Sequence, residues 1–199
     1  MPLRAKLAIA LLLALPVPGR ALSLQSADQA LRAAFPGATH FEAEGVTLSA
    51  SERGNLDKVL GRRSLDAYAV RYNAVDGAGQ SLGTAWMDDE IGKHLPITYL
   101  VALDPQQKIV AVSMLTYREA HGLEARSPRF TRQFKGKGAE AMLTVGRDLD
   151  AISGATLSCQ TLAFGARKAL SQEALYLQQR ASQAPRPASE NPTRQEKKK

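Results

Sequence analysis

One short segment of the chain combines a hydroxyl side chain, small residues and the signals of a helix start. Residues 150–158 are Asp-Ala-Ile-Ser-Gly-Ala-Thr-Leu-Ser. We expect Ser153 to cap a helix, so that Gly154, Ala155 and Thr156 form its first turn. The amides of a first turn have no partner inside the helix, and the helix dipole adds partial positive charge there. Such a turn is suited to hold a phosphate group, which the hydroxyl of Thr156 could carry as an ester.

The residues around this hydroxyl fit the same chemistry. Gly154 and Ala155 leave room for a bulky group, and Asp150 could hold a divalent metal while the ester is formed. The same residues also fit a plain capped helix whose small side chains lie at a packing contact. The segment alone does not decide between the two interpretations.

The elements that would position this segment begin with helices and continue with strands. Residues 26–35 predict a short amphipathic helix with Ser26 as its N-cap, and residues 48–60 predict a weaker helix that ends at Gly61. Residues 67–75 alternate in polarity, as in a half-buried strand, and residues 80–87 can return after an Asp-Gly-Ala-Gly turn as the second arm of a hairpin.

A second predicted hairpin joins residues 96–103 and 108–117, which are rich in β-branched side chains and are expected in the centre of the sheet. Residues 118–138 are aperiodic, and Phe130 and Phe134 indicate that they pack onto something. A final helix follows Ser153 and runs to residue 170 or 179. This order predicts an α+β fold, a single domain in which an antiparallel sheet of hairpins is flanked by helices.

The N-terminus has the layout of a secretory signal peptide. Arg4 and Lys6 precede the apolar residues 7–17, and the small residues Ala21 and Ser23 offer cleavage sites. We therefore expect a signal peptide at residues 1–23, a folded domain at 24–179 and a disordered basic tail at 180–199, because the tail is rich in Pro, Ser, Gln and Lys and poor in apolar residues. An uncleaved membrane anchor is the alternative for the first segment.

Charge and metal-ligand content narrow the function classes. Residues 24–179 hold 17 basic and 17 acidic side chains, so the net charge of +7 comes from the two ends. On this count no nucleic-acid partner is expected. Cys159 and three scattered histidines match no zinc or haem spacing, and no metal site is expected.

The segment Asp150-x-x-Ser153-Gly154-Ala155-Thr156 resembles the flavinylation motif of FMN-binding domains. These domains occur in the C subunit of the sodium-pumping NADH:quinone oxidoreductase, in the G subunit of the Rnf complex and in small exported proteins. The resemblance implies covalent FMN, esterified through its phosphate to Thr156 by a flavin transferase that uses FAD and magnesium. It also implies an α+β fold with the flavin ring against the sheet and the long loop.

A second stretch supports the resemblance. The family has a segment similar to Glu-Thr-Pro-Gly-Leu-Gly after a strand pair, and this chain has Glu-Ala-His-Gly-Leu-Glu at residues 119–124. Glu119, Gly122 and Leu123 keep the pattern and are expected to contact the flavin. Ala120, His121 and Glu124 depart from it, so contacts at those three positions are not implied.

The function implied is electron transfer by an exported flavoprotein, in the periplasm and near the inner membrane. Its expected partners are the flavin transferase and a redox protein, itself soluble or membrane-bound; the oligomeric state stays open. No catalytic residues are expected, because the domain would carry electrons rather than act on a substrate of its own. The main alternative is a non-redox binding module of the same fold.

Several other residues have two interpretations. Lys93 and His121 could act on a reduced flavin or be plain loop residues. Cys159 could be a reactive thiol but more often such a residue is a small buried apolar group. Trp86 and Tyr99 could stack on a flavin ring, although aromatic residues in strands usually belong to the core.

Overall fold

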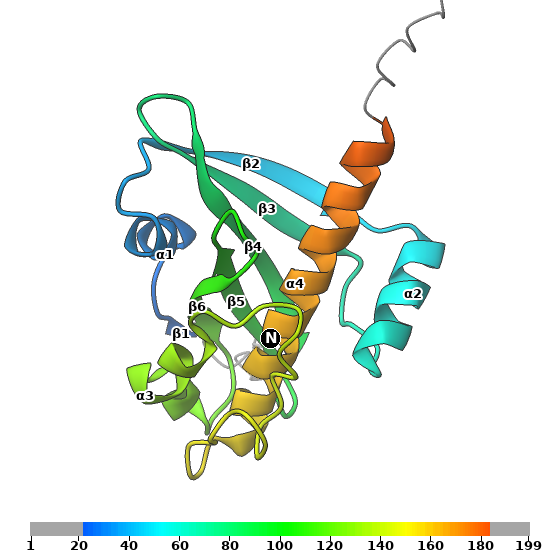
Figure 1. Ribbon diagram of the computed structural model, residues 1–199. Coiled ribbons are helices and arrows are strands. Elements are labelled where there is room, and N and C mark those ends of the chain that lie inside the picture. The colour runs from blue at the N-terminus through cyan, green and yellow to red at the C-terminus, as the bar shows by residue number, and fades with distance from the viewer. Residues whose placement is uncertain (1–21, 184–199) are drawn as a thin grey trace, which may run out of the picture.

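The computed structural model describes residues 22–183. Twelve elements follow one another along this part of the chain (Figure 1). They are β1 (Leu22–Ser23), α1 (Ala27–Ala34), β2 (His40–Thr47), α2 (Ala50–Leu60), β3 (Tyr68–Val75), β4 (Ser81–Ile91), β5 (Pro96–Leu103), β6 (Ile109–Tyr117), the 3-10 helix η1 (Leu123–Arg126), α3 (Pro128–Thr131), the 3-10 helix η2 (Arg132–Phe134) and α4 (Thr156–Gln183).

The strands form one antiparallel sheet in the order β1-β6-β5-β4-β3-β2. The long helix α4 crosses one face of this sheet, and α1 lies against β5 and β6 (Figure 1). The expected α+β fold, with hairpins flanked by helices, is therefore confirmed. Within residues 22–183 no helix is both long enough and apolar enough to span a membrane.

Both faces of the sheet are covered near β5, which explains its composition. Residues 97 and 99–103 of this strand are fully buried. Toward α4 the core contains Trp86, Tyr99 and Leu162, and toward α1 it contains Leu31 and Leu100. A strand buried on both faces is almost continuously apolar, as the sequence indicated. β6 lies beside the two-residue β1 and not in the centre of the sheet, so its predicted central place was wrong.

Local signals set most of the element ends. Ser26 accepts from the amide of Gln29 and forms a capping box at the start of α1. Gly61 ends α2 in the left-handed conformation (φ 69°). In the turn between β5 and β6 the carboxylate of Asp104 accepts from the amides of Gln106 and Lys108, both at 2.9 Å. These predictions of caps and turns are confirmed.

Other elements were missed or have different ends. The short helices η1, α3 and η2 lie in residues 118–138, which were predicted to be aperiodic. β2 was not predicted, because it is an edge strand with mostly exposed side chains and little alternation. β4 continues to Ile91, past the expected end at residue 87. α4 ends at Gln183, beyond residue 179.

The predicted signal peptide and tail lie largely outside the described residues. Of the signal segment only Leu22 and Ser23 are described, and they pair with Tyr117 and Thr116 at the end of β6. Cleavage after Ala21 keeps this pairing, whereas cleavage after Ser23 removes it. The two cleavage sites suggested by the sequence therefore differ in whether β1 exists in the mature protein.

Candidate functional site

The helix of the chemical segment begins later than the sequence suggested. α4 starts at Thr156. Ser153 and Gly154 form a turn in which the amide of Ala155 donates to the carbonyl of Ile152 at 2.9 Å. Gly154 has φ 79°, a left-handed conformation that a helix cannot continue. Ser153 is therefore not the N-cap, and Gly154 and Ala155 precede the first helical turn instead of forming it.

The shift places Thr156 at the first position of the helix. The first backbone hydrogen bond of α4 runs from the amide of Cys159 to the carbonyl of Ala155 at 2.9 Å. The amides of Thr156, Leu157 and Ser158 consequently have no partner inside the helix. The side chain of Thr156 is exposed, and a Cβ added at Gly154 would meet no atom within 4 Å. A hydroxyl thus stands in open space at the positive end of a 28-residue helix.

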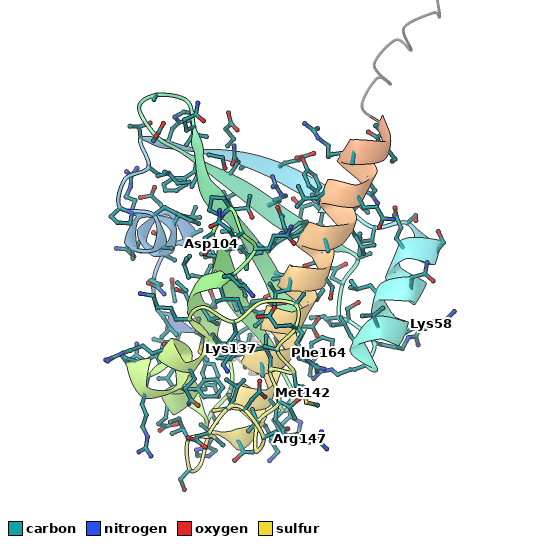
Figure 2. The ribbon with its side chains drawn as sticks, viewed as in Figure 1. Lys58, Asp104, Lys137, Met142, Arg147 and Phe164 are labelled. Carbon is teal, nitrogen blue, oxygen red and sulfur yellow. The ribbon has the colours of Figure 1, made fainter. Side chains whose placement is uncertain are left out.

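A glutamine of η2 holds the loop that precedes this turn. The side chain of Gln133 accepts from the amide of Asp150 at 2.7 Å and donates to its carbonyl at 3.0 Å. This pair of bonds holds the backbone six residues ahead of Thr156, while the side chain of Asp150 points to solvent. Figure 2 shows Arg147 on the same loop, near the end of the molecule where α4 begins.

Glu119, which the motif predicts to contact the flavin, makes contacts within the protein in this structure. Its carboxylate accepts from the amides of His94 and Leu95, the latter at 2.8 Å. Burial alone would raise the pKa of Glu119, but these backbone donors outweigh burial and hold the pKa below its usual value. The contacts of Glu119 are thus to the turn before β5, which it fixes.

Gly122 joins the second motif stretch to the first turn of α4. Its φ is 101°, and an added Cβ would lie 2.4 Å from the Oγ of Ser158 and 2.8 Å from the hydroxyl of Tyr117. That hydroxyl donates to the carbonyl of His121 and lies 3.0 Å from the same Ser158 Oγ. Burial raises the pKa of Tyr117, so the phenol stays protonated at neutral pH. Only glycine fits at this contact between loop and helix.

The same loop borders a cavity of about 560 Å³. Leu123, the half-buried residue that follows Gly122, lines this cavity. Within residues 22–183, the lining also includes Glu124, Arg126, Ser127 and Pro128. The two motif stretches, far apart in sequence, therefore meet beside a space that can hold part of a larger ligand.

Several residues with two interpretations are now placed. Cys159 is fully buried, and burial raises the pKa of its thiol, so it behaves as a small apolar group. Trp86 and Tyr99 are also buried, in the core between the sheet and α4. Lys93 and His121 are exposed.

The sequence interpretation missed a network of buried charges between β4 and α4. The ammonium of Lys168 lies 2.9 Å from the Asp88 carboxylate and 2.8 Å from that of Glu90. Burial raises the pKa of Asp88 to about 6, an effect that Lys168 offsets only in part. Acidic residues at alternate positions of β4 were the available signal, since side chains two apart in a strand share a face.

A second part of this network lies one turn further along α4. Arg71 on β3 donates two bonds to the carboxylate of Glu173, both at 2.9 Å, and the indole of Trp86 donates a third at 2.8 Å. The charged residues of β3 and β4 that face α4 are thus each paired with a residue of the helix. The network fixes α4 on the sheet.

Fold and site together define an α+β domain in which a loop and a long helix meet around an exposed threonine. The profile of the FMN-binding domain family matches residues 92–171, which run from the turn before β5 into α4. The resemblance to that family is therefore confirmed, and the match includes both motif stretches.

A solved structure shows the same fold. It is NqrC from Shewanella oneidensis, with a TM-score of 0.53 and 16% sequence identity. The alignment covers 75% of this chain and 88% of that chain. No curated protein sequence matches the chain.

Proposed function

We propose that this chain is an exported electron carrier that holds FMN covalently, through a phosphoester between the flavin phosphate and the hydroxyl of Thr156. The observation that carries the proposal is the exposed hydroxyl at the first position of α4, beside amides without helical partners, inside the segment that matches the FMN-binding domain profile. Bound FMN would supply reversible uptake and release of electrons.

The residues around Thr156 fit a flavin phosphate. The free amides of Thr156, Leu157 and Ser158 offer donors to its oxygens, and the helix dipole stabilises its charge. The open space at Gly154 admits the group, whereas a larger residue with φ near 79° would be strained. The structure therefore supports attachment at the first helical position.

The ring would lie over the cavity that Leu123 borders. Gly122 and Tyr117 hold that loop against Ser158, two residues after the attachment point. The residues that depart from the family pattern, Ala120, His121 and Glu124, are all exposed. His121 takes part in the contact between loop and helix only through its carbonyl, and the side chain of Glu124 lines the cavity. The departures therefore change side chains near the ring and leave the contact between loop and helix intact.

Partners and location belong to the same proposal. A flavin transferase would attach the FMN, and a redox protein in the periplasm or at the inner membrane would exchange electrons with it. Sequencing the N-terminus of the secreted protein tests export: a chain that begins at residue 22 or 24 supports it, and one that retains Met1 contradicts it.

Attachment is tested by intact mass after coexpression with a flavin transferase, FAD and magnesium. The wild-type chain should gain the mass of one FMN less one water and should stay yellow after denaturation. Thr156→Ser keeps a hydroxyl and should still be modified, whereas Thr156→Ala should not. A Thr156→Ala chain with the full mass gain would refute the assignment of the residue, and flavin that dialyses away from the denatured wild type would refute the covalent bond.

A non-redox binding module of the same fold is the second candidate, because three positions of the loop stretch differ from the family pattern. It predicts an unmodified mature chain in the native host.

A further inference from the structure

The segment η1–α3–η2 carries a regular row of cations. Arg126, Arg129, Arg132 and Lys135 follow one another at intervals of three residues, and we call these four residues the basic ridge. Arg129 and Arg132 lie three apart in the continuous helical stretch of α3 and η2, where such residues are neighbours. Arg126 ends η1 before the extended Ser127, and Lys135 directly follows η2. All four are exposed, and none forms an ion pair within residues 22–183.

The side chains on the other side of this segment are turned inward. Phe130 and Phe134 are fully buried, with their rings in edge-to-face contact at 5.2 Å. They anchor the segment to the core and leave its charged side to solvent. No acidic residue lies between residues 125 and 139. The exposed carboxylates that border the segment are Glu124, in the lining of the same cavity as Arg126, and Asp150, whose backbone Gln133 holds. The four cations outnumber them, so the balanced charge of the folded part conceals a local excess of positive charge.

The basic ridge borders the site proposed for the flavin. Arg126 lines the same cavity as Leu123. Gln133, between Arg132 and Phe134, holds the backbone of Asp150 in the loop that leads to Thr156. α3 accordingly lies beside the end of the molecule where α4 begins (Figure 1).

We propose that the basic ridge is the docking surface for an acidic face of the protein that exchanges electrons with this chain; this rests on the function proposed above. Complementary charge steers diffusional encounter and orients partners without strong binding. Electron carriers need such encounters, because a partner has to leave after each transfer and redox complexes bury little surface. A partner held by these cations would place its own redox centre beside the cavity.

The structure favours a protein over other anionic partners. An interfacial membrane helix presents apolar side chains to the lipid, but Phe130 and Phe134 are buried and unable to insert. Surfaces that bind single-stranded nucleic acid present aromatic rings for base stacking, and the basic ridge exposes none. A salt-dependent contact with carboxylates fits the exposed cations best.

The flavinylated protein allows a test with two small redox probes of opposite charge. Hexacyanoferrate(III) is an anion and tris(bipyridine)cobalt(III) is a cation, and each oxidises the reduced flavin directly. Arg129→Glu with Arg132→Glu changes the local charge by four units. At low salt the rate with the anion should fall about tenfold and the rate with the cation should rise, as expected where a surface potential of several kT acts on the encounter. Both differences should shrink near 1 M salt, where the screening length is about 3 Å.

A matched variant controls for total charge. Lys58→Glu with Arg63→Glu changes the charge by the same four units, at exposed positions on and just after α2. α2 lies on the opposite side of the molecule from α3 (Figure 1). This variant should change either rate less than twofold. Equal effects of the two variants would overturn the proposal, because they would show that only the net charge matters.

A second experiment does not depend on the flavin. The flavin-free Thr156→Ala chain is titrated with a polyglutamate peptide, duplex DNA and phosphatidylglycerol vesicles. The proposal expects salt-sensitive binding of the peptide that weakens at least fivefold in the doubly charge-reversed chain. Binding of DNA or vesicles alone, or binding of the peptide that the variant leaves unchanged, would overturn it. If no flavin is attached in the first experiment, the proposed function fails while this titration still decides whether the basic ridge binds acidic protein segments.

Discussion

Asp88 gives the sharpest prediction about stability. It is buried against α4, and its pKa is raised to about 6 from its ordinary value of 3.8 because burial disfavours the charge. The folded protein therefore holds a proton on Asp88 at pH values where the unfolded chain has lost it. Stability associated with this proton is present below the unfolded pKa and is lost as the pH rises through the folded pKa. A shift of about two units corresponds to about 3 kcal/mol over the whole window.

The perturbation is Asp88→Asn, which keeps the shape of the side chain and removes its titration. Lys168 retains Glu90 at 2.8 Å, so the substitution leaves the ammonium with a buried counter-ion. Between about pH 5 and about pH 8 the free energy of unfolding should fall by roughly 1.4 kcal/mol more in the wild type than in the variant. This is less than the full value of about 3 kcal/mol because the interval covers only the upper part of the window in which Asp88 titrates. The carboxylates whose pKa values are lowered lie outside this network and cancel in the difference between the two proteins; they are Glu52, Asp57, Glu119, Glu140 and Asp148.

Urea unfolding of the flavin-free chain measures both free energies. Trp86 is the only tryptophan of the sequence and is buried against α4, so its fluorescence reports the loss of this packing. The expected result is a difference in unfolding free energy between wild type and variant that changes steadily with pH, in favour of the variant at high pH. A constant difference from pH 5 to pH 8, or one that changes in the opposite direction, would refute the account of Asp88 as a carboxyl with a raised pKa.

Two further predictions concern glycine and tyrosine contacts. Gly165→Ala places a Cβ 2.5 Å from the ring of Tyr99 and should destabilise the fold by about 1–3 kcal/mol through overpacking. Gly54→Ala in α2, where an added Cβ meets no atom within 4 Å, should stabilise the fold by up to about 1 kcal/mol. Thermal unfolding of both variants measures these changes in stability, and equal changes would contradict the prediction. Tyr117→Phe removes the hydroxyl between His121 and Ser158 and should lower the free energy of unfolding by about 1 kcal/mol. It should also shift the flavin absorbance spectrum. An unchanged spectrum in a destabilised protein would limit the hydroxyl to a structural role.

The sequence predicted well those features that local chemistry determines. The cap at Ser26, the left-handed Gly61 and the turn at Asp104 follow from residue types that act on their own neighbours. The β5 strand was predictable because a continuous apolar run of this length is stable only where both faces of the sheet are covered. The position of Thr156 at a helix start was also predictable, although the helix begins three residues after its expected cap.

Features that depend on tertiary partners were not predictable. Asp88 and Glu90 have low strand propensity, so β4 was ended before them. Pairing with Lys168, which is 78 residues from Glu90 along the chain, keeps both in the strand. Ser153 is a favourable N-cap, yet the left-handed Gly154 moves the helix start to Thr156. Nothing in the local sequence indicated that Glu119 binds the amides of the turn before β5.

The buried charges have a consequence for the site at the other end of the helix. Lys168 lies twelve residues after Thr156, about 18 Å along the axis at 1.5 Å per residue. A shift of α4 by one residue would rotate it by about 100° and separate Lys168 from Asp88 and Glu173 from Arg71, and an unpaired buried charge costs about 3–5 kcal/mol. An apolar interface would tolerate such a shift far better. The network therefore sets the rotation and height of α4, and with them the direction in which Thr156 and its free amides face the loop at Gly122.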